Sequence, residues 1–588
     1  MSSSIVAQSP PTNHSFVPAI TVDADSKGLL AEDVLVQVTN AYLNEIWSDV
    51  GTPNQPTPAV IKDELIRRVN NEFGILNVDA KGPDRIPRLK SLAPLQIAML
   101  LTALHRVIRV MPVGRPADRD RPLLAIYVDD PVSPDYGTYS TSELDMYAVA
   151  CKYSLTLDDR GWKQVHTTLS VHAPSRTQCV NPDYVAVNNG VFDYSTKTMY
   201  SFDPDLVFLN KVRTTYNEKA VSPKITGPDG TDWDVDSWIA ELSDDPEVVH
   251  LLWELIGAVV RPHVRWNKAA FLSNQSGSNG KGTYVSLMQN LLGVGGYISM
   301  PIVNFSKEFL LEPLLAGGPI LTHENPVGAF ASEADAFKCV VTNDDFTINR
   351  KNRPPVQHQH WGFMVQCVNG LPKFKDRSES LLRRILPVPF DKRFIGSTER
   401  REIKDDYLTR PEVLEYVLKR VLHDMPAFYS LSEPASCVAL LGELRENNDP
   451  VTEFWAEHED VFVWDLLPFA FLYDVYTAWF RKTNPSGTII SARSFTDSLM
   501  PLVETSQIWQ CENKRKQIRT GKRMSQPERL IAVYGLNDWK DPSYTGSDPD
   551  KMSIPAAASQ YRGLERIPGS NPPGASAGGP ATDYDLTA

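Results

Sequence analysis

Apolar residues recur at helical spacing in the first part of the chain and predict two helices. Four residues of the stretch 32–47 share one face, namely Val34, Val38, Tyr42 and Ile46. The stretch 93–110, with the sequence APLQIAMLLTALHRVIRV, is more strongly apolar and predicts a second helix. We therefore expect a helical region over residues 31–120, whose role the pattern does not indicate. Residues 1–30 are rich in Ser, Pro and Thr, and we expect them to be disordered.

Strand and turn patterns then predict an α+β domain over residues 121–265. Its first strand is the apolar run LLAIYV at 123–128. The sequence YVAVNNGVFDY at 184–194 predicts two strands joined by a tight turn at Asn-Asn-Gly. Residues 235–260 are expected to be helical, and the Asp-Asp pair before Pro246 can cap a helix start there.

The segment 268–293, KAAFLSNQSGSNGKGTYVSLMQNLLG, has the order that a phosphate-binding site requires. A short apolar strand is followed by a loop of Gly, Ser and Asn, and then by a helix. Small loop residues let backbone N–H groups converge on phosphate oxygens, and the helix start adds partial positive charge. Lys281 can then reach the β and γ phosphates of a nucleotide. The candidate nucleotide-binding residues are Ser276, Gly277, Ser278, Asn279, Gly280, Lys281, Gly282 and Thr283.

This loop departs twice from the strict pattern G-x-x-x-x-G-K-[ST]. Gln275 stands in place of the first glycine, and Gly282 stands in place of the hydroxyl residue that binds magnesium. Thr283, one position later, is therefore the candidate for that hydroxyl. The alternative interpretation is a glycine-rich loop before a helix that binds no ligand.

Three further groups supply the chemistry that a nucleotide site needs beyond its loop. Glu324 follows the apolar strand 319–322 and is a candidate for holding magnesium or polarising water. Asn369 follows the strand 362–368 and can hold the attacking water or the γ-phosphate. Arg383 and Arg384 precede a last apolar strand, where an arginine can act across a subunit boundary on transition-state charge. The alternatives are a surface glutamate, a turn and a solvated pair of arginines.

The order of these motifs over residues 275–390 resembles the superfamily 3 helicases. GSNGKGT, an apolar strand followed by Glu, Asn-Gly-Leu-Pro, Asp-Arg, and Arg-Arg-Ile before Pro-Phe occur in that order. The chain is most similar to the branch of phage and plasmid primase-helicases that includes the poxvirus enzymes. The resemblance extends upstream to VAVNNGVFDYSTKTMYSFDPD and downstream to VTEFWAEH and FLYDVYTAWF, so that it covers about residues 120–540.

This resemblance implies an α/β fold with a central motor and flanking modules. The motor is an AAA+-like P-loop ATPase domain over residues 266–395, preceded by a pre-motor domain over 121–265. A helical connector over 396–445 leads to a winged-helix-type DNA-binding module over 446–540. The remaining residues, 541–588, are rich in Pro, Gly, Ser and Ala, and we expect them to form a disordered tail.

The resemblance also implies roles for single residues. These are a Walker A loop with Lys281 and Thr283, a Walker B carboxylate at Glu324, a sensor at Asn369 and an arginine finger at Arg384. His323 precedes that carboxylate, where many relatives pair two carboxylates. The implied cofactors are ATP and Mg²⁺, and the implied partners are single-stranded or forked DNA and further copies of the chain in a ring, expected to be a hexamer. The implied activity is a DNA helicase in phage or plasmid replication.

Two basic segments are candidates for contact with DNA. In such helicases a hairpin with basic residues lies between the second and third motifs, and its candidates here are Arg350, Lys351 and Arg353. The other candidates lie in the segment 512–529 and are Lys514, Arg515, Lys516, Arg519, Lys522 and Arg523. This segment lies between a predicted helix and the predicted strand LIAVYGL, which is how a winged-helix wing presents cations. The alternatives are a solvated turn and a flexible loop.

Composition changes this picture only slightly. The net charge of −13 argues against a uniformly basic nucleic-acid coat but leaves room for a local basic lining. The six cysteines lack zinc-site spacing, no apolar run approaches the roughly 18 residues of a membrane span, and the N-terminus lacks a signal pattern. We expect a cytoplasmic protein without membrane contact, in the host cytoplasm if it is viral.

Two other functions stay open at this point. A packaging ATPase or a kinase is a different P-loop enzyme, but a packaging motor should bring a nuclease domain with clustered acidic residues. A non-hydrolysing origin-binding or loader protein with a degenerate loop stays open because of Gln275 and Gly282. A working primase is not expected, since the tempting acidic pair Asp129-Asp130 lies before a proline, where such pairs more often mark a turn.

Overall fold

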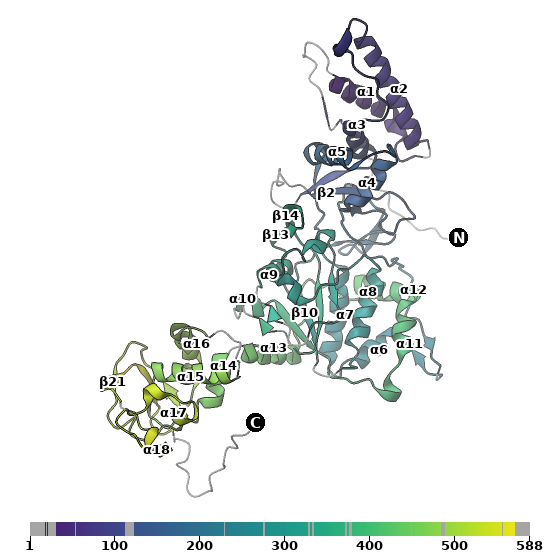
Figure 1. Cartoon of the computed structure of the whole chain (residues 1–588). Helices are drawn as coiled ribbons and strands as arrows, with labels where there is room; N and C mark the ends of the chain where they lie inside the picture. Colours follow the sequence, from purple (N-terminus) through teal and green to yellow (C-terminus); the bar gives the residue numbers. More distant parts are fainter. Residues whose placement is uncertain are drawn as a thin grey trace. The chain divides into compact units, whose positions relative to one another are not determined.

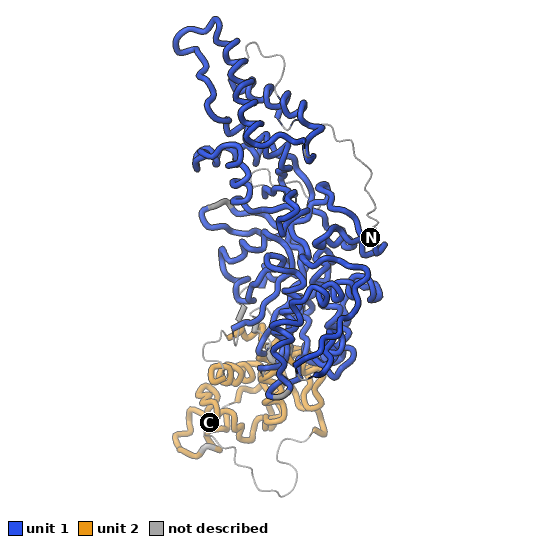
Figure 2. The backbone as a smooth tube through the Cα atoms, turned by 90° about the vertical axis from the view of Figure 1, so that its right-hand side faces the viewer, with its two compact units in different colours: residues 1–441 blue, residues 442–588 orange. Residues whose placement is uncertain are grey.

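Helices and strands are mixed along the chain, which is an α/β protein whose elements are labelled in Figure 1. It divides into two compact units, residues 1–441 and 442–588, drawn in blue and orange in Figure 2. The computed structural model describes residues 18, 20–21, 31–52, 54–111, 123–228, 230–274, 277–326, 330–331, 334–370, 373–374, 379–448, 450–483, 489–555 and 557–570. Disorder is expected of residues 1–30 and 571–588. These residues lie outside the described ones, except for residues 18, 20 and 21.

The first part of unit 1 is helical, as the apolar spacing predicts, but a four-stranded sheet completes it. Its helices are α1 (Ala31–Ile46), α2 (Pro58–Leu76), α3 (Pro94–Leu104), α4 (Glu143–Cys151) and α5 (Asp159–His172). Its strands, in the order β3-β2-β1-β4, are β1 (Ile108–Met111), β2 (Leu123–Tyr127), β3 (Tyr139–Ser140) and β4 (Ser175–Thr177).

The helix predicted over 93–110 is wrong at its end, because β1 begins at Ile108. The side chains of Ile108 and Val110 are buried, and β1 pairs with both β2 and β4. These partner strands come from later in the chain, so the local pattern could not reveal them. One hydrophobic core runs through residues 42–173, and the boundary expected at residue 120 therefore does not separate two folded bodies.

The hairpin expected at 184–194 is confirmed by the antiparallel pairing of β5 with β6. The strands of this meander are β5 (Tyr184–Val187), β6 (Gly190–Asp193) and β7 (Thr198–Tyr200), and a second short pair is β8 (Ile225–Thr226) with β9 (Asp232–Trp233). The helical stretch expected at 235–260 is two helices, α6 (Val235–Glu241) and α7 (Pro246–Val260). Asp245 caps α7 by accepting a hydrogen bond from Glu247 N at 2.9 Å, as the Asp-Asp-Pro sequence predicts.

A parallel four-stranded sheet forms the centre of unit 1. Its order is β11-β15-β10-β17, and the strands are β10 (Ala269–Ser273), β11 (Ile320–Thr322), β15 (Met364–Val368) and β17 (Ile385–Pro389). All neighbouring pairs run parallel, so the carboxyl ends of the four strands lie at one edge. These strands are almost wholly buried, which explains why they appear in the sequence as continuous apolar runs.

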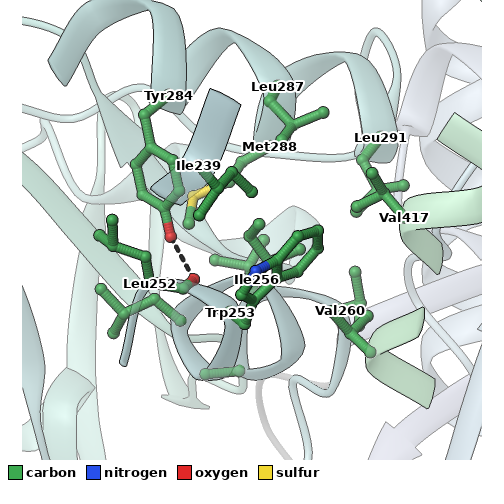
Figure 3. Close-up of a cluster of buried hydrophobic side chains, with 14 of the residues drawn as sticks. Ile239, Leu252, Trp253, Ile256, Val260, Tyr284, Leu287, Met288, Leu291 and Val417 are labelled. Atoms are coloured by element: carbon green, nitrogen blue, oxygen red, sulfur yellow. Dashed lines mark hydrogen bonds between the residues drawn. The ribbon is translucent and has the colours of Figure 1, made fainter. Parts of the chain in front are cut away.

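The helix after the first strand of this sheet is α8 (Lys281–Leu292), and it shares its core with the preceding domain. Figure 3 shows Tyr284, Leu287 and Leu291 of α8 facing α7, with the Tyr284 hydroxyl donating a hydrogen bond to Leu252 O at 2.5 Å. The boundary expected at residue 265 therefore runs through a single hydrophobic core.

The segment expected to be a helical connector over 396–445 belongs to this same core. Its helices are α11 (Arg401–Asp405), α12 (Pro411–Lys419) and α13 (Ala435–Asn448). Leu408, Val417 and Val421 are fully buried in the cluster that contains α7 and α8. The other elements around the sheet are α9 (Asp335–Thr342), α10 (Glu379–Leu382), β12 (Phe330–Ala331) with β16 (Lys373–Phe374), and the hairpin β13 (Asp345–Arg350) with β14 (Arg353–Gln359).

Unit 2 is a small α/β module with its own core. Its helices are α14 (Pro450–His458), α15 (Phe469–Thr483), α16 (Ala492–Thr505), α17 (Arg529–Val533) and α18 (Pro549–Met552). Its strands are β18 (Leu466–Pro468), β19 (Trp509–Gln510), β20 (Ile518–Arg519), β21 (Gln560–Tyr561) and β22 (Gly563–Arg566). In the part of the chain that the structure describes, no helix is both long and apolar enough to span a bilayer.

Two expectations about this module are wrong. The sequence LIAVYGL, predicted as a strand, forms α17 in its first part, because Glu528 caps a helix start there by accepting from Leu530 N. The tail expected over 541–588 is ordered through residue 570, since β22 is the middle strand of the sheet β18-β22-β19. Backbone pairing and the fully buried Leu564 hold β22, and composition records neither contribution.

We expect Leu564→Ala to lower the free energy of unfolding of unit 2 by about 2–5 kcal/mol, because it leaves a cavity beneath the middle strand. Hydrogen exchange of peptides from 450–570 in increasing urea measures this free energy. Gln560→Ala, at an exposed position of β21, is the control and should change it by less than about 0.5 kcal/mol. Equal stabilities of the two variants would show that the module ends before β22.

Candidate nucleotide-binding site

A glycine-containing loop joins the carboxyl end of β10 to the start of α8. Its backbone is left-handed at Ser278 (φ +59°) and at Gly280 (φ +84°), and α8 begins at Lys281. The positive φ of Gly280 favours glycine, and a Cβ there would lie 2.9 Å from Leu242 Cδ2, so the leucine side chain would have to shift. Phe394 N donates to Ser278 O at 2.7 Å, which ties the loop to the segment after β17. Two residues of the loop lie outside the described residues, namely the candidate Ser276 and Gln275, which replaces the first glycine of the pattern.

Lys281 is a nearly buried cation at the first position of α8. The residue is only 6% exposed, and its Nζ donates a hydrogen bond to Asn274 O at 3.4 Å. Burial lowers the pKa of Lys281 because the charged form loses hydration. Among the residues that the structure describes, no carboxylate forms an ion pair with it. The ammonium and the free N–H groups of the first turn of α8 therefore make this end of the helix suited to an anion.

The predicted residue Asn369 lies beside this loop. Ser273 is in register with Val368, and Asn274 N donates to Val368 O at 3.4 Å. Asn369 therefore lies next to the start of the loop. Its side chain is exposed at the sheet edge. The preceding thiol, Cys367, has its pKa raised to about 12 by burial, with the charges of Lys281 and Glu324 acting in opposite directions.

The end of β11 brings Glu324 to the same edge. Thr322 and Asn325 on either side of it are buried, whereas Glu324 is exposed. Asn325 Nδ2 donates to Gln366 Oε1 and to Cys367 O, both at 3.0 Å, and its Oδ1 accepts from Ile302 N at 2.8 Å. This amide fastens the tip of β11 to β15 and so fixes the position of Glu324. Sequence reasoning missed Asn325, whose only signal is an amide directly after the strand-end acid.

His323 joins the tip of β11 to α8. Its Nε2 lies 2.6 Å from Gln289 Oε1, and a Cβ built on Gly282 would lie 3.8 Å from its Nδ1. Burial lowers the pKa of His323, Lys404 adds to this effect, and Glu324 opposes it. The imidazole is therefore neutral at physiological pH.

Arg384 lies at the opposite edge of the sheet. Its carbonyl oxygen accepts from Ala269 N at 2.7 Å, at the amino end of β10, which is about 15 Å of strand away from the loop. The residue is only 8% exposed, and its guanidinium donates to Ser380 Oγ at 2.8 Å. Arg383, next to it, is exposed. Neither residue approaches the loop of its own chain.

Three family models match this chain. Residues 446–539 match the model described as Poxvirus D5 protein-like, and residues 156–242 match the one described as D5 N terminal like. Residues 272–384, which carry the loop and the strand ends, match a family of unknown function. Two separate segments of the chain thus resemble parts of the poxvirus D5-like proteins.

Solved structures and curated proteins add little to this assignment. The A form apo structure of the NrS-1 C-terminal region (305–718) is 13% identical, covering 78% of this chain and 94% of that one, with a TM-score of 0.38. An inhibitor-bound JCV helicase is 11% identical, covering 36% of this chain and 58% of that one, with a TM-score of 0.22. At such TM-scores these likenesses carry no argument here. No curated protein matches the chain.

The basic hairpin expected of this D5-like chain is present as β13 and β14. The two strands pair antiparallel, Asn352 turns the chain with φ +58°, and Ile348 anchors the hairpin in the core. Lys351 is exposed at the tip and Arg350 is half-buried, whereas the side chain of Arg353 lies outside the described residues. The hairpin geometry is thus confirmed, and contact with DNA stays a prediction.

The basic segment of unit 2 divides into paired and unpaired cations. All six are exposed, and they lie between β19 and α17. Three of them have acidic partners, in the pairs Lys514–Asp497 at 2.9 Å, Lys516–Glu512, and Arg523–Glu565 at 3.3 Å. The other three, Arg515, Arg519 and Lys522, have no acidic partner among the residues that the structure describes. A solvated anion such as a phosphate backbone has direct access to these three.

The acidic pair considered for primase chemistry stands in a turn. Asp130 Oδ1 accepts a hydrogen bond from Val132 N at 3.0 Å, the local bond by which aspartate shapes a turn. Within the described residues, no three His, Cys, Asp or Glu side chains gather in a way that could hold a metal ion.

Replacing Asn325 by alanine should lower the free energy of unfolding of unit 1 by about 1–3 kcal/mol, since it leaves buried partners on β15 and at Ile302 without their hydrogen bonds. Urea unfolding, followed by hydrogen exchange in peptides from β11 and β15, measures the loss. Asn349→Ala removes an exposed amide from the same unit and should change the free energy by less than about 0.5 kcal/mol. If Asn325→Ala loses no more free energy of unfolding than this control, Asn325 does not fasten the tip of β11 to β15.

Proposed function

We propose that this chain is an ATP-dependent DNA helicase that works in the replication of a phage or plasmid genome. The observation that carries the proposal is the shared edge of the parallel sheet. There the loop before α8, with the buried cation of Lys281, meets the strand ends that carry Glu324 and Asn369. A lysine at a helix start beside an acid and an amide is the arrangement that nucleoside-triphosphate hydrolysis requires.

The described residues fit a nucleotide with its magnesium ion. The N–H groups of the loop and of the first turn of α8, with Lys281, are suited to the β and γ phosphates. Thr283 and Glu324 would hold magnesium, which needs only one or two protein oxygen ligands besides phosphates and water. When bound, the ion neutralises charge that develops on the phosphates. The proposal includes an AAA+-like motor. In it the loop before α8 is the P-loop, Glu324 is the strand-end acid and Asn369 is the sensor amide.

Each remaining group then has a task in phosphoryl transfer to water. Asn369 orients the attacking water, Glu324 polarises it, and Lys281 stabilises the charge that accumulates on the phosphates. Arg384 cannot reach the loop of its own chain, so its proposed role as a finger requires a neighbouring copy. This requirement supports a closed ring, which we take to be a hexamer.

DNA contact is assigned to the two basic surfaces. Lys351 and Arg350 on the β13–β14 hairpin can bind backbone phosphates, and so can the unpaired cations of unit 2. We regard unit 2 as the winged-helix-type module of the motor. The second candidate function, a non-hydrolysing origin-binding or loader protein, is favoured by one observation, the glycine at position 282 in place of a hydroxyl residue.

Lys281→Ala should reduce the rate of ATP hydrolysis in the presence of single-stranded DNA by at least about 100-fold, because one preorganised charge contributes that much to phosphoryl transfer. Phosphate release, measured with and without DNA, tests this expectation. Lys219→Ala, at an exposed position of the same unit, should leave the rate unchanged. If the wild-type protein and the Lys281→Ala variant both fail to hydrolyse ATP while still binding DNA, the loader function replaces the helicase.

Replacing Arg515, Arg519 and Lys522 together by alanine should weaken DNA binding and reduce the slope of log affinity against log salt by about 2, as expected for three lost phosphate contacts on a single strand. Fluorescence anisotropy with a labelled oligonucleotide between 50 and roughly 200 mM salt measures both quantities. The matched control replaces Lys514, Lys516 and Arg523, whose charges are already partly neutralised. An equal or larger loss in the control would contradict the division between paired and unpaired cations.

A further inference from the structure

Two features of the candidate nucleotide site lie next to each other in space. Position 282 lacks the hydroxyl side chain of the strict loop pattern, and an imidazole, His323, directly precedes the acid Glu324. A Cβ on Gly282 would lie 3.8 Å from His323 Nδ1. The imidazole nitrogen thus stands beside the space that a hydroxyl at position 282 would enter.

A hydrogen bond to Gln289 determines the tautomer of His323, and so which ring nitrogen can accept. Gln289 Oε1 lies 2.6 Å from Nε2 and can only accept, so Nε2 carries the proton and donates it. In the neutral ring Nδ1 then has a free lone pair directed at the first turn of α8. Metal-binding histidines are held in this way, with one nitrogen donating to a fixed oxygen and the other available for the ion.

His323 and Glu324 follow one another after β11 but differ in their surroundings. His323 lies against α8 through its contact with Gln289, whereas Glu324 is exposed. The ion of a nucleotide lies next to the helix start that binds its phosphates, which is the side of His323.

We propose that His323 Nδ1 is a direct ligand of the divalent cation that accompanies the nucleotide, in addition to Thr283 and Glu324. This inference rests on the proposed nucleotide-binding function of the loop. It adds an imidazole nitrogen to the oxygen ligands of the cation. An imidazole ligand also favours transition-metal ions over Mg²⁺, so Mn²⁺ should bind the nucleotide complex better than it does at sites made of oxygen ligands alone.

Electron spin-echo spectroscopy of bound Mn²⁺ tests the contact without any measure of activity. The full chain, with ¹⁵N placed only in histidine, is loaded with Mn²⁺ and a non-hydrolysable ATP analogue. We expect a ¹⁵N coupling of the size of a directly bonded imidazole, which His323→Gln abolishes. His172→Gln, at an exposed position, should leave it unchanged. Retention of the analogue is measured in the same samples.

The outcomes separate this inference from the function on which it rests. Bound Mn²⁺ and analogue without histidine coupling would overturn the inference and leave the nucleotide site standing. Failure of the wild-type chain to bind the analogue at all would overturn both.

A second variant tests the orienting hydrogen bond. Gln289→Leu keeps the size of the side chain but removes the acceptor for Nε2–H, and we expect it to weaken Mn²⁺ binding about 10–100-fold. The midpoint temperature of thermal unfolding should be close to that of the wild type, since Gln289 is only half-buried. Unchanged Mn²⁺ affinity would refute the orienting role.

Discussion

The parallel pairing of β10 with β15 on one side and β17 on the other is the constraint on which the site depends. Because all these strands run the same way, whatever follows each of them emerges at one edge. The loop is then fastened to the segment after β17, where Asn274 Nδ2 donates to Phe390 O and Ser278 O accepts from Phe394 N. A lysine as buried as Lys281 is costly to hold without a partner, and this fastening keeps it in place.

The helix that follows the candidate loop is also tied to regions that the sequence divides into separate domains. Tyr284 joins α8 to α7, and the helices after the sheet bury residues such as Leu408 and Val417 in the same core. A shift of α8 would therefore move the elements packed on either side of it in this core. Packed interiors transmit such shifts because they contain few voids. A continuous core of this kind is compatible with the proposed motor, whose chemistry would have to move distant surfaces.

The sequence predicts those parts of the fold that are determined locally. β10 and α8 follow one uninterrupted pattern. The limits of β10 and the end of α8 agree with the structure, whereas α8 begins at Lys281, two residues before the predicted helix. Long-range pairing decides the elements that were predicted wrongly, since β1 depends on β2 and β4, and β22 depends on two distant strands. The same distinction holds in the site. The strand-end positions of Glu324 and Asn369 follow from the pattern, whereas the supporting contacts of Asn325 and His323 reach side chains that no spacing rule connects to them.

The position of Arg384 bears on the ring assembly that we propose for this chain. Its backbone is fixed at the amino end of β17, and the nucleotide loop is at the carboxyl end of the neighbouring strand, so no side-chain rotation can bring the two together. In the proposed nucleotide site, a second copy that presents the opposite edge of its sheet would supply Arg384 as a further cation besides Lys281. Such a contact is head-to-tail, and head-to-tail contacts close into rings when the rotation between copies permits.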